Sequence, residues 1–173
     1  MRQPTPAQTI GPFYGHALPF AGGEAMAPPG HPGTLTLHGH VYDGDGEPVT
    51  DALLEFWQPG PDGSRTGKPG SLARNGVDFT GFGRVPTDGS GHWTLRTLAP
   101  GGVPYLCVAV FARGLPNHLF TRVYLAEAPD PLLDSLEPEL RRTLVAAPDP
   151  AVRGHRFDIH LQGPHETVFL EFH

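Results

Sequence analysis

Apolar and polar residues alternate along several short segments of the chain, which predicts β-strands. In residues 34–42 the side chains of Leu35, Leu37 and Val41 fall on one face of an extended backbone. Turn-forming Gly, Asp and Pro residues separate the segments, as at 43–46 and 87–91. The further strands are expected at residues 52–57, 79–85, 93–98, 105–112, 122–125, 156–161 and 167–172. About eight short strands at this spacing predict an all-β fold, an antiparallel β-sandwich.

One segment follows a helical period instead. Between residues 131 and 144, leucines recur at steps of three and four residues, which predicts a single short helical excursion from the sandwich. Those leucines are Leu132, Leu133, Leu136, Leu140 and Leu144. The strand pattern begins only near residue 34, so we expect an N-terminal arm at 1–33 and a β-sandwich domain at 34–173.

Composition limits the classes of partner and the compartment. The 173 residues carry a net charge of −6 and no cluster of Lys and Arg, which argues against nucleic-acid binding. No apolar run approaches the length of a membrane span, and the N-terminus lacks the order of a signal peptide. Cys107 is the single cysteine and cannot form an internal disulfide, so we expect a cytoplasmic protein. It stands among apolar neighbours, where a core position is expected.

The ten histidines raise the question of a metal site. His38 and His40 are two apart on a predicted strand and point to one face, where they could share a metal. Because the rest of that face is polar, a solvated surface is the alternative. Asp158 and His160 share a face with Arg156, which fits an ion-paired stripe as well as a ligand set.

The segment before the first strand has the features of a docking element. Gly11 and Pro12 favour a tight bend, since Pro fixes φ and Gly tolerates conformations closed to other residues. Phe13 and Tyr14 follow directly, and two adjacent aromatic side chains are costly to leave in water. The segment is expected to dock on a partner or to pack on its own domain.

Motifs along most of the chain resemble the intradiol ring-cleaving dioxygenases. They occur in family order at residues 5–14, 53–59, 81–84, 91–101, 110–115, 117–119, 121–124, 156–163 and 166–169. The Phe-Ala-Arg-Gly motif at 111–114 is similar to the iron-free alpha type of subunit and not to the iron-carrying beta type.

The resemblance implies a non-haem ferric centre held by two tyrosinates and a His-x-His pair, ligands that suit Fe(III). In this chain Tyr105 and Cys107 stand at the two histidine positions, and the first tyrosine position falls near Arg65. The second tyrosine would follow Gly102, where the chain is shorter than the family pattern; Tyr105 can also be matched to it. Either alignment leaves at most one of four ligands, so this chain is expected to hold no metal and no catalytic residue.

A supporting role is therefore implied beside an iron-bearing beta subunit, which would hold the Fe(III) that acts on a small aromatic acid and O₂. Carried over by motif, Thr9, Gly11 and Pro12 would line the shared substrate cavity, and Arg113 would stand near the substrate's carboxylate or the cavity mouth. A guanidinium suits that task because it forms charged, bidentate hydrogen bonds. The alternatives are a surface ion pair for Arg113 and a local turn hydrogen bond for Thr9.

Two other functions remain open. The chain could be a non-catalytic module of the same fold that binds an aromatic acid or directs assembly. The turn-strand pattern at 43–49 also occurs in hydrolases or carriers built on transthyretin-like sandwiches. No Gly-x-Ser-x-Gly motif is present, so a serine nucleophile is not indicated.

Overall fold

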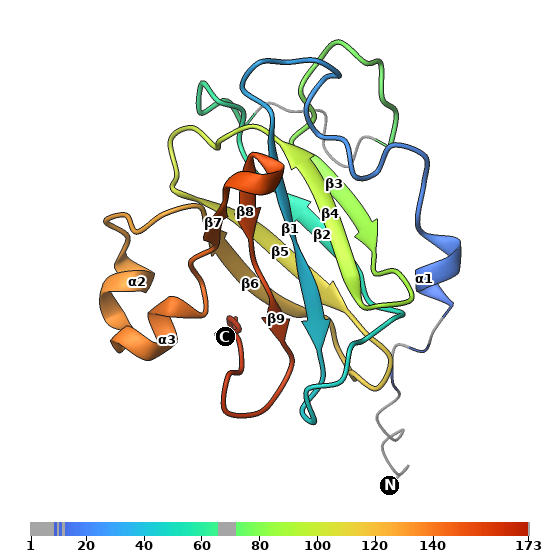
Figure 1. Ribbon diagram of the computed structural model, residues 1–173, viewed down its shortest axis with the longest axis vertical. Helices are drawn as coiled ribbons and strands as arrows, with labels where there is room; N and C mark the ends of the chain where they lie inside the picture. The colour runs from blue at the N-terminus through green and yellow to red at the C-terminus, as the bar shows by residue number, and fades with distance from the viewer. Residues whose placement is uncertain (1–8, 10, 12, 66–71, 173) are drawn as a thin grey trace, which may run out of the picture.

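The computed structural model describes residues 9, 11, 13–65 and 72–172. Within them the chain forms nine strands, three α-helices and one 3₁₀ helix, coloured in chain order in Figure 1. The strands are β1 Leu35–Tyr42, β2 Leu53–Trp57, β3 Phe82–Pro86, β4 His92–Thr97, β5 Tyr105–Phe111, β6 Leu119–Tyr124, β7 Ala147–Asp149, β8 Gly154–Arg156 and β9 Ile159–His160. The helices are α1 Tyr14–Ala17, α2 Pro131–Ser135, α3 Pro138–Arg142 and η1 Pro150–Val152. None of the described helices is long and apolar enough to cross a membrane.

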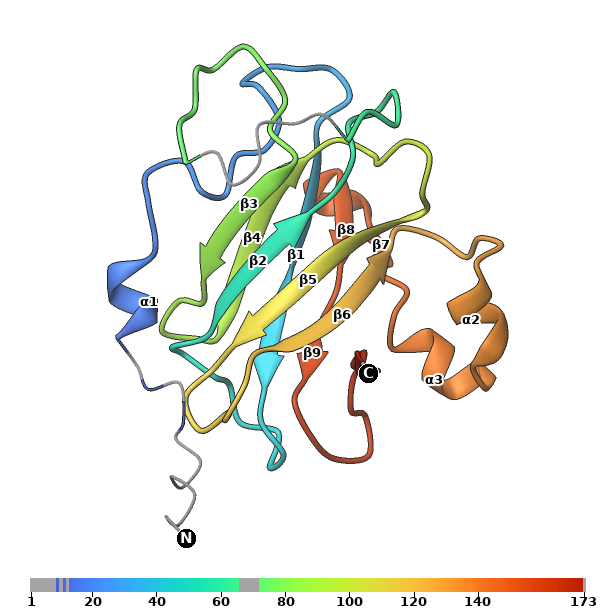
Figure 2. The ribbon, with the colours of Figure 1, turned by 180° about the vertical axis from the view of Figure 1, so that it is seen from behind.

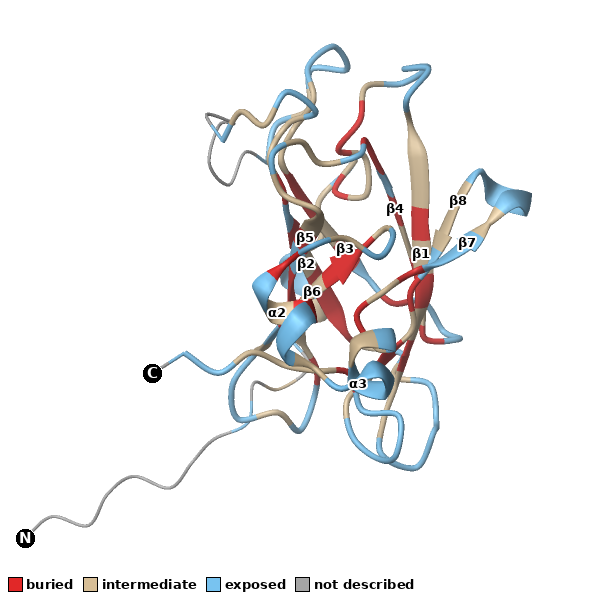
Figure 3. Ribbon diagram, turned by 90° about the vertical axis from the view of Figure 1, so that its left-hand side faces the viewer, coloured by how far each residue is buried: buried red, intermediate tan, exposed pale blue. Residues whose placement is uncertain are grey.

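The strands form two packed sheets, which confirms the predicted all-β sandwich. One sheet has the order β4-β1-β8-β7, with β9 also paired to β1, and the other has the order β3-β2-β5-β6. Figure 3 views the sandwich from the side, with buried segments in the strands of both sheets. The core between them is apolar and includes the fully buried side chains of Leu37, Phe56, Leu95 and Val108. Burial of such side chains is the main favourable term in folding.

The strand predicted at 156–161 is in fact two short strands, which was not expected. Both pair with β1 in parallel, and they are separated where Phe157 crosses β1 at Gly39. The Phe157 amide donates to the His38 carbonyl (2.7 Å), and any Cβ on Gly39 would collide with the Phe157 carbonyl oxygen. The crossing therefore needs glycine at position 39, and it interrupts the ladder between β8 and β9.

The prediction of a strand at 167–172 was wrong. Only an isolated antiparallel bridge remains, in which the Leu170 amide donates to the Phe120 carbonyl (2.8 Å). The segment follows the edge strand β6 without forming a continuous ladder.

The single helix predicted at 131–144 is divided into α2 and α3. Pro138 has no amide hydrogen, and it disfavours helical backbone in the residue before it. Glu137 is accordingly extended, with φ −59° and ψ 149°. The leucine period still has a structural basis, because Leu133 and Leu144 are fully buried in a second, smaller apolar cluster.

The described part of the predicted arm packs on the sandwich before β1 begins. Met26 is buried in the main core, and its amide donates to the Arg96 carbonyl (2.9 Å) beside β4. The division into an arm at 1–33 and a domain at 34–173 stays a prediction.

Candidate functional site

Two of the residues singled out by the resemblance, Tyr105 and Arg113, lie near the two ends of β5. Tyr105 opens this strand and Arg113 follows its last residue, Phe111. Figure 2 shows β5 crossing its sheet, so these positions are at opposite ends of the sandwich. Each end is a separate candidate site.

At the start of β5, the positions matched to iron ligands converge. Arg65, Tyr105 and Cys107 line one pocket of about 330 Å³. The remaining lining residues are Trp57, Gln58, Pro59 and Val103. The three positions therefore lie close together in space, although they are separated by up to 42 positions in sequence.

A buried glutamine and a close backbone contact hold this pocket in shape. Gln58 is only 8% exposed; its side-chain amide donates to the Leu98 carbonyl (2.9 Å) and accepts from the Thr97 hydroxyl (2.7 Å). The Gly101 amide donates to the Gly60 carbonyl (3.0 Å), and a side chain at Gly101 would collide with the facing backbone. The loop that carries Arg65 is thus fastened to the turn before β5.

Tyr105 lies over a cation supplied by the neighbouring strand. The Arg122 guanidinium carbon is 3.9 Å from the centre of the Tyr105 ring, within the range of a cation–π interaction. Arg122 is itself held by the carboxylate of Asp130 (3.3 Å), which also accepts from the Tyr124 hydroxyl (2.9 Å). Burial raises the pKa of Tyr124 to about 12, so the phenol keeps its proton at neutral pH and donates the hydrogen bond to Asp130. The stack fixes the orientation of the Tyr105 ring.

The donor set of this pocket does not fit a ferric ion. It offers one phenol and one thiol beside the Arg65 cation, whereas two imidazoles and two phenolates would be needed. Cys107 reaches solvent, yet the protein packed around it raises the pKa of its thiol, which disfavours the thiolate. Nor do the described residues contain a group of three or more His, Cys, Asp and Glu side chains that could hold a metal.

The expectation that Cys107 is a core residue was wrong. The burial along β5 alternates at its start, and Cys107 is on the exposed outer face of the sheet, paired across to Trp57 and Arg122. The prediction relied on the apolar neighbours of Cys107 in sequence. These neighbours do not tell the two faces of the strand apart, because Ala109, on the same outer face as Cys107, is buried.

The predicted substrate-binding residues that the structure describes are not buried. Thr9 is exposed, Gly11 has φ +75° in the region that favours glycine, and Pro12 lies outside the described residues. The Arg113 side chain is 66% exposed and its Nε is 3.1 Å from an Asp51 carboxylate oxygen. The contact with Asp51 is the surface ion pair that was the alternative for Arg113. The role of these residues at a substrate cavity stays a prediction.

Tyr14 fastens the root of the arm at the Phe111 end of β5. Its hydroxyl donates to the Asp51 carbonyl (3.1 Å) and its ring lies 6.1 Å from that of Phe111. Burial, followed by the nearby Asp51 carboxylate, raises the pKa of Tyr14 to about 12. Phe13, by contrast, is 83% exposed. Of the adjacent aromatics in the sequence, one packs on the domain and the other is presented to solvent.

The histidines of β1 lie on a polar, partly exposed face of the sheet. His38 Nε2 is 3.0 Å from an Asp149 carboxylate oxygen, and the ring of His40 contacts that of His92 at 5.1 Å between centroids. Both β1 histidines are partly exposed. This arrangement fits the solvated face that was the alternative to a shared metal.

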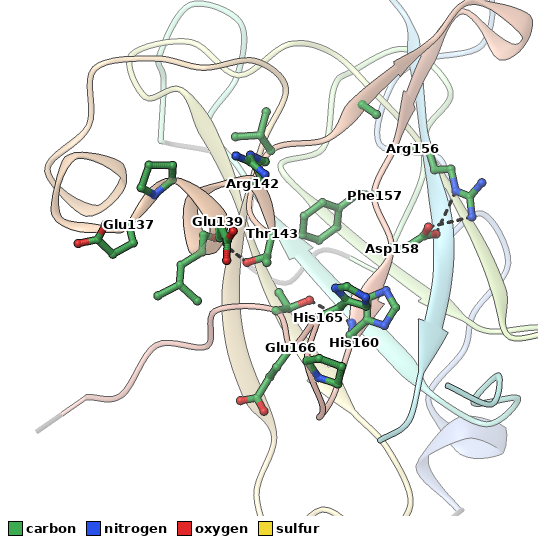
Figure 4. A pocket seen from close by; sticks show the side chains of 16 residues that line it. Glu137, Glu139, Arg142, Thr143, Arg156, Phe157, Asp158, His160, His165 and Glu166 are labelled. Atoms are coloured by element: carbon green, nitrogen blue, oxygen red, sulfur yellow. Dashed lines mark hydrogen bonds and ion pairs between the residues drawn. The ribbon is translucent and has the colours of Figure 1, made fainter. Parts of the chain in front are cut away.

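A larger pocket, which the sequence did not indicate, lies between α3 and the chain after β8. Its volume is about 1150 Å³, and Figure 4 shows side chains of both charges around it. Arg156 pairs with Asp158 (2.8 Å), the ion-paired stripe expected as one alternative. The His160 and His165 rings meet edge to face at 6.0 Å between centroids, and burial lowers the pKa of His160. The mixed charge gives this pocket no evident preference for a ligand.

The comparisons with known proteins agree with the fold and with the resemblance. A sequence model of a family described as "Dioxygenase" matches residues 9–109, and the solved structures similar in fold include a dioxygenase domain and catechol 1,2-dioxygenases. The chain belongs to the intradiol dioxygenase family.

Its relatives include both kinds of subunit. It is 39% identical to the protocatechuate 3,4-dioxygenase alpha chain of Burkholderia cepacia, over 96% of each chain. Identity to the beta chain from the same organism is 27%, over 77% of this chain and 66% of that one. Among solved structures, the dioxygenase domain of a carbohydrate-binding fusion protein from Streptomyces sp. SirexAA-E has a TM-score of 0.58 at 29% identity, covering 80% of this chain and 86% of that one.

Proposed function

We propose that the chain is the alpha subunit of a protocatechuate 3,4-dioxygenase. The complex cleaves the ring of protocatechuate between its two hydroxylated carbons and inserts both atoms of O₂, giving 3-carboxy-cis,cis-muconate. The observation that carries the proposal is the pocket at the start of β5, where Arg65, Tyr105 and Cys107 replace a ferric ligand set in a chain similar to an alpha chain over nearly its whole length.

In this proposal the iron belongs to the beta subunit. Fe(III) bound there supplies the oxygen chemistry, and no metal is held by this chain. The assembly is expected in the cytoplasm, since the single cysteine requires no oxidising compartment.

This chain contributes the walls of the cavity at the arm end of β5. Thr9, Gly11 and Pro12 approach the flat ring of the substrate, and Arg113 pairs with its carboxylate. The exposure of the guanidinium supports that role, because the contact with Asp51 uses one of its five N–H donors. Asp51 also orients the guanidinium.

Co-expression with an adjacent beta reading frame tests the proposal. The purified complex should contain iron and consume O₂ in the presence of protocatechuate, whereas this chain alone should do neither. Oxygen uptake by the beta subunit that is unchanged by adding this chain would favour the alternative, a non-catalytic module that binds an aromatic acid or directs assembly.

A further inference from the structure

The pocket at the start of β5 has the chemistry of a site for a flat anion. Among the described residues that line it, Arg65 is a cation and none is a carboxylate, and the walls include Trp57, Tyr105 and Val103. A volume of about 330 Å³ is at the lower end of the range of small-molecule pockets, enough for a ligand with one ring.

The two aromatic walls are held in place before any ligand binds. Trp57 is 40% exposed, and its far side packs on the buried ring of Phe82 at 4.5 Å between centroids. The Tyr105 ring is fixed by Arg122 beneath it. A pocket whose walls are already ordered loses less entropy on binding than one that must be assembled.

Arg65, the cation among the described lining residues, is available to a ligand. No carboxylate pairs with Arg65 among the residues that the structure describes, and the nearby Asp62 side chain turns into its own loop to accept from the Ser64 amide (2.9 Å). The loop itself is anchored through Gly60 to Gly101 (3.0 Å). A carboxylate bound beside Arg65 would therefore meet a guanidinium that has no competing acid among the described residues.

We propose that this pocket is a metal-free binding site for a small planar aromatic carboxylate. The ring lies against Trp57 and Tyr105, and the carboxylate pairs with Arg65. The site is separate from the cavity at Arg113, and it is a binding site only, because the pocket offers no group that could activate oxygen.

Titration of the full-length chain with benzoate, followed by NMR, tests this proposal. The chain has two tryptophans: Trp57 in the pocket, and Trp93, which is 1% exposed in the core. Benzoate should shift the indole N–H resonance of Trp57 in a saturable manner and leave that of Trp93 unchanged. No shift at Trp57 up to about 10 mM benzoate, where a contact of millimolar affinity would be evident, would overturn the proposal.

Matched variants and ligands separate the anion from the ring. Arg65→Ala should weaken benzoate binding by about tenfold or more, while Arg65→Lys should retain part of it and Arg96→Ala, at an exposed arginine that pairs with Glu24, all of it. Neutral benzamide and non-planar cyclohexanecarboxylate should both bind more weakly than benzoate. Equal affinity of wild type and Arg65→Ala would overturn the assignment of Arg65, and equal affinity of the two carboxylates would overturn the flat site.

The outcome is independent of the proposed assembly. Benzoate binding at Trp57 needs neither a beta subunit nor iron, so it can fail while the co-expressed complex remains active. Conversely, the complex can be inactive while benzoate still shifts the Trp57 resonance in a saturable, Arg65-dependent manner. That result would support the binding site and contradict the proposed function.

Discussion

Arg113 carries the most specific claim made for one side chain. In the assembled dioxygenase, Arg113→Ala should weaken substrate capture by about 1–3 kcal/mol, because a charged hydrogen bond to the carboxylate is lost. The loss should appear mainly in KM, and it should shrink for catechol, which lacks the carboxylate. Steady-state oxygen uptake with both substrates measures it, with Arg96→Ala as a control at an exposed arginine that pairs with Glu24. Equal losses for both substrates would mean that Arg113 supports packing or assembly.

The exposure of Cys107 predicts that its substitution has little effect on stability. Since its side chain is on the outer face of the sheet, Cys107→Ser should change the free energy of unfolding by no more than about 0.5 kcal/mol. Denaturant unfolding of the isolated chain measures the change. A loss above about 1 kcal/mol would show that the thiol is buried in solution.

Gln58 joins the ends of two strands from opposite sheets. Gln58→Ala leaves the buried Thr97 hydroxyl and the Leu98 carbonyl without their partner, so it should lower the free energy of unfolding by about 1–3 kcal/mol. Urea unfolding checks this, with Gln162→Ala as the matched change at an exposed glutamine. Similar costs for the two variants would contradict the role of Gln58 as a buried clamp.

The imidazole face of β1 and β4 makes stability depend on pH. Burial is the largest cause that lowers the pKa of His92, followed by the neighbouring His40; Asp88 and Asp158 act in the opposite direction, and His38 adds to the lowering. A histidine whose pKa is lowered on folding binds fewer protons in the folded state than in the unfolded one. Its contribution to stability is therefore present above the unfolded value of 6.5 and is lost as pH falls.

The free energy of unfolding should accordingly decrease between about pH 7 and pH 5, where unperturbed carboxylates still remain ionised. His92→Gln should reduce the slope of this decrease, whereas His16→Gln, at an exposed position in α1, should leave it unchanged. Urea unfolding at several pH values gives both slopes. An identical slope in wild type and His92→Gln would contradict the assignment.

Strands in which apolar and polar residues alternate regularly were predictable from the sequence. The points at which predicted strands and the predicted helix are interrupted were predictable only in part. The alternation around Leu37 predicted β1 to within one residue, because the period is local. The break at Pro138 could also be predicted from the local sequence, but the leucine period indicated one continuous helix. The crossing of Phe157 over Gly39 depends on residues more than a hundred positions apart, which no local pattern contains. Local patterns also could not reveal the partners of Gln58, because Thr97 and Leu98 are 39 and 40 positions away at the end of β4.

For the molecule as a whole, the principal expectation concerns colour and metal. Tyrosinate bound to Fe(III) absorbs visible light, so the isolated chain should be colourless and the complex with beta should be coloured. Metal analysis and a visible spectrum of both samples, prepared with the same iron supply, check this. Stoichiometric iron with a visible band in the isolated chain would contradict the proposal that beta alone holds the metal.

The candidate sites were predictable to different degrees. The resemblance matched Arg65, Tyr105 and Cys107 to ligand positions, and the structure brings the three residues to one pocket. The pair of Arg113 with Asp51 was only one of two alternatives, since sequence does not tell which acid a surface arginine meets. The anchoring of Arg65 through Gly60 and Gly101 could not be foreseen, because it is a contact between two loops.

The length of β5 has a consequence for two ligands bound at once. Seven residues at about 3.4 Å each separate its ends by roughly 20 Å, which is more than twice the Debye length at physiological salt. An anion at Arg65 and another at Arg113 would hardly repel each other. Each would then raise the melting temperature by an amount set by its own concentration and dissociation constant, and the two increments would add.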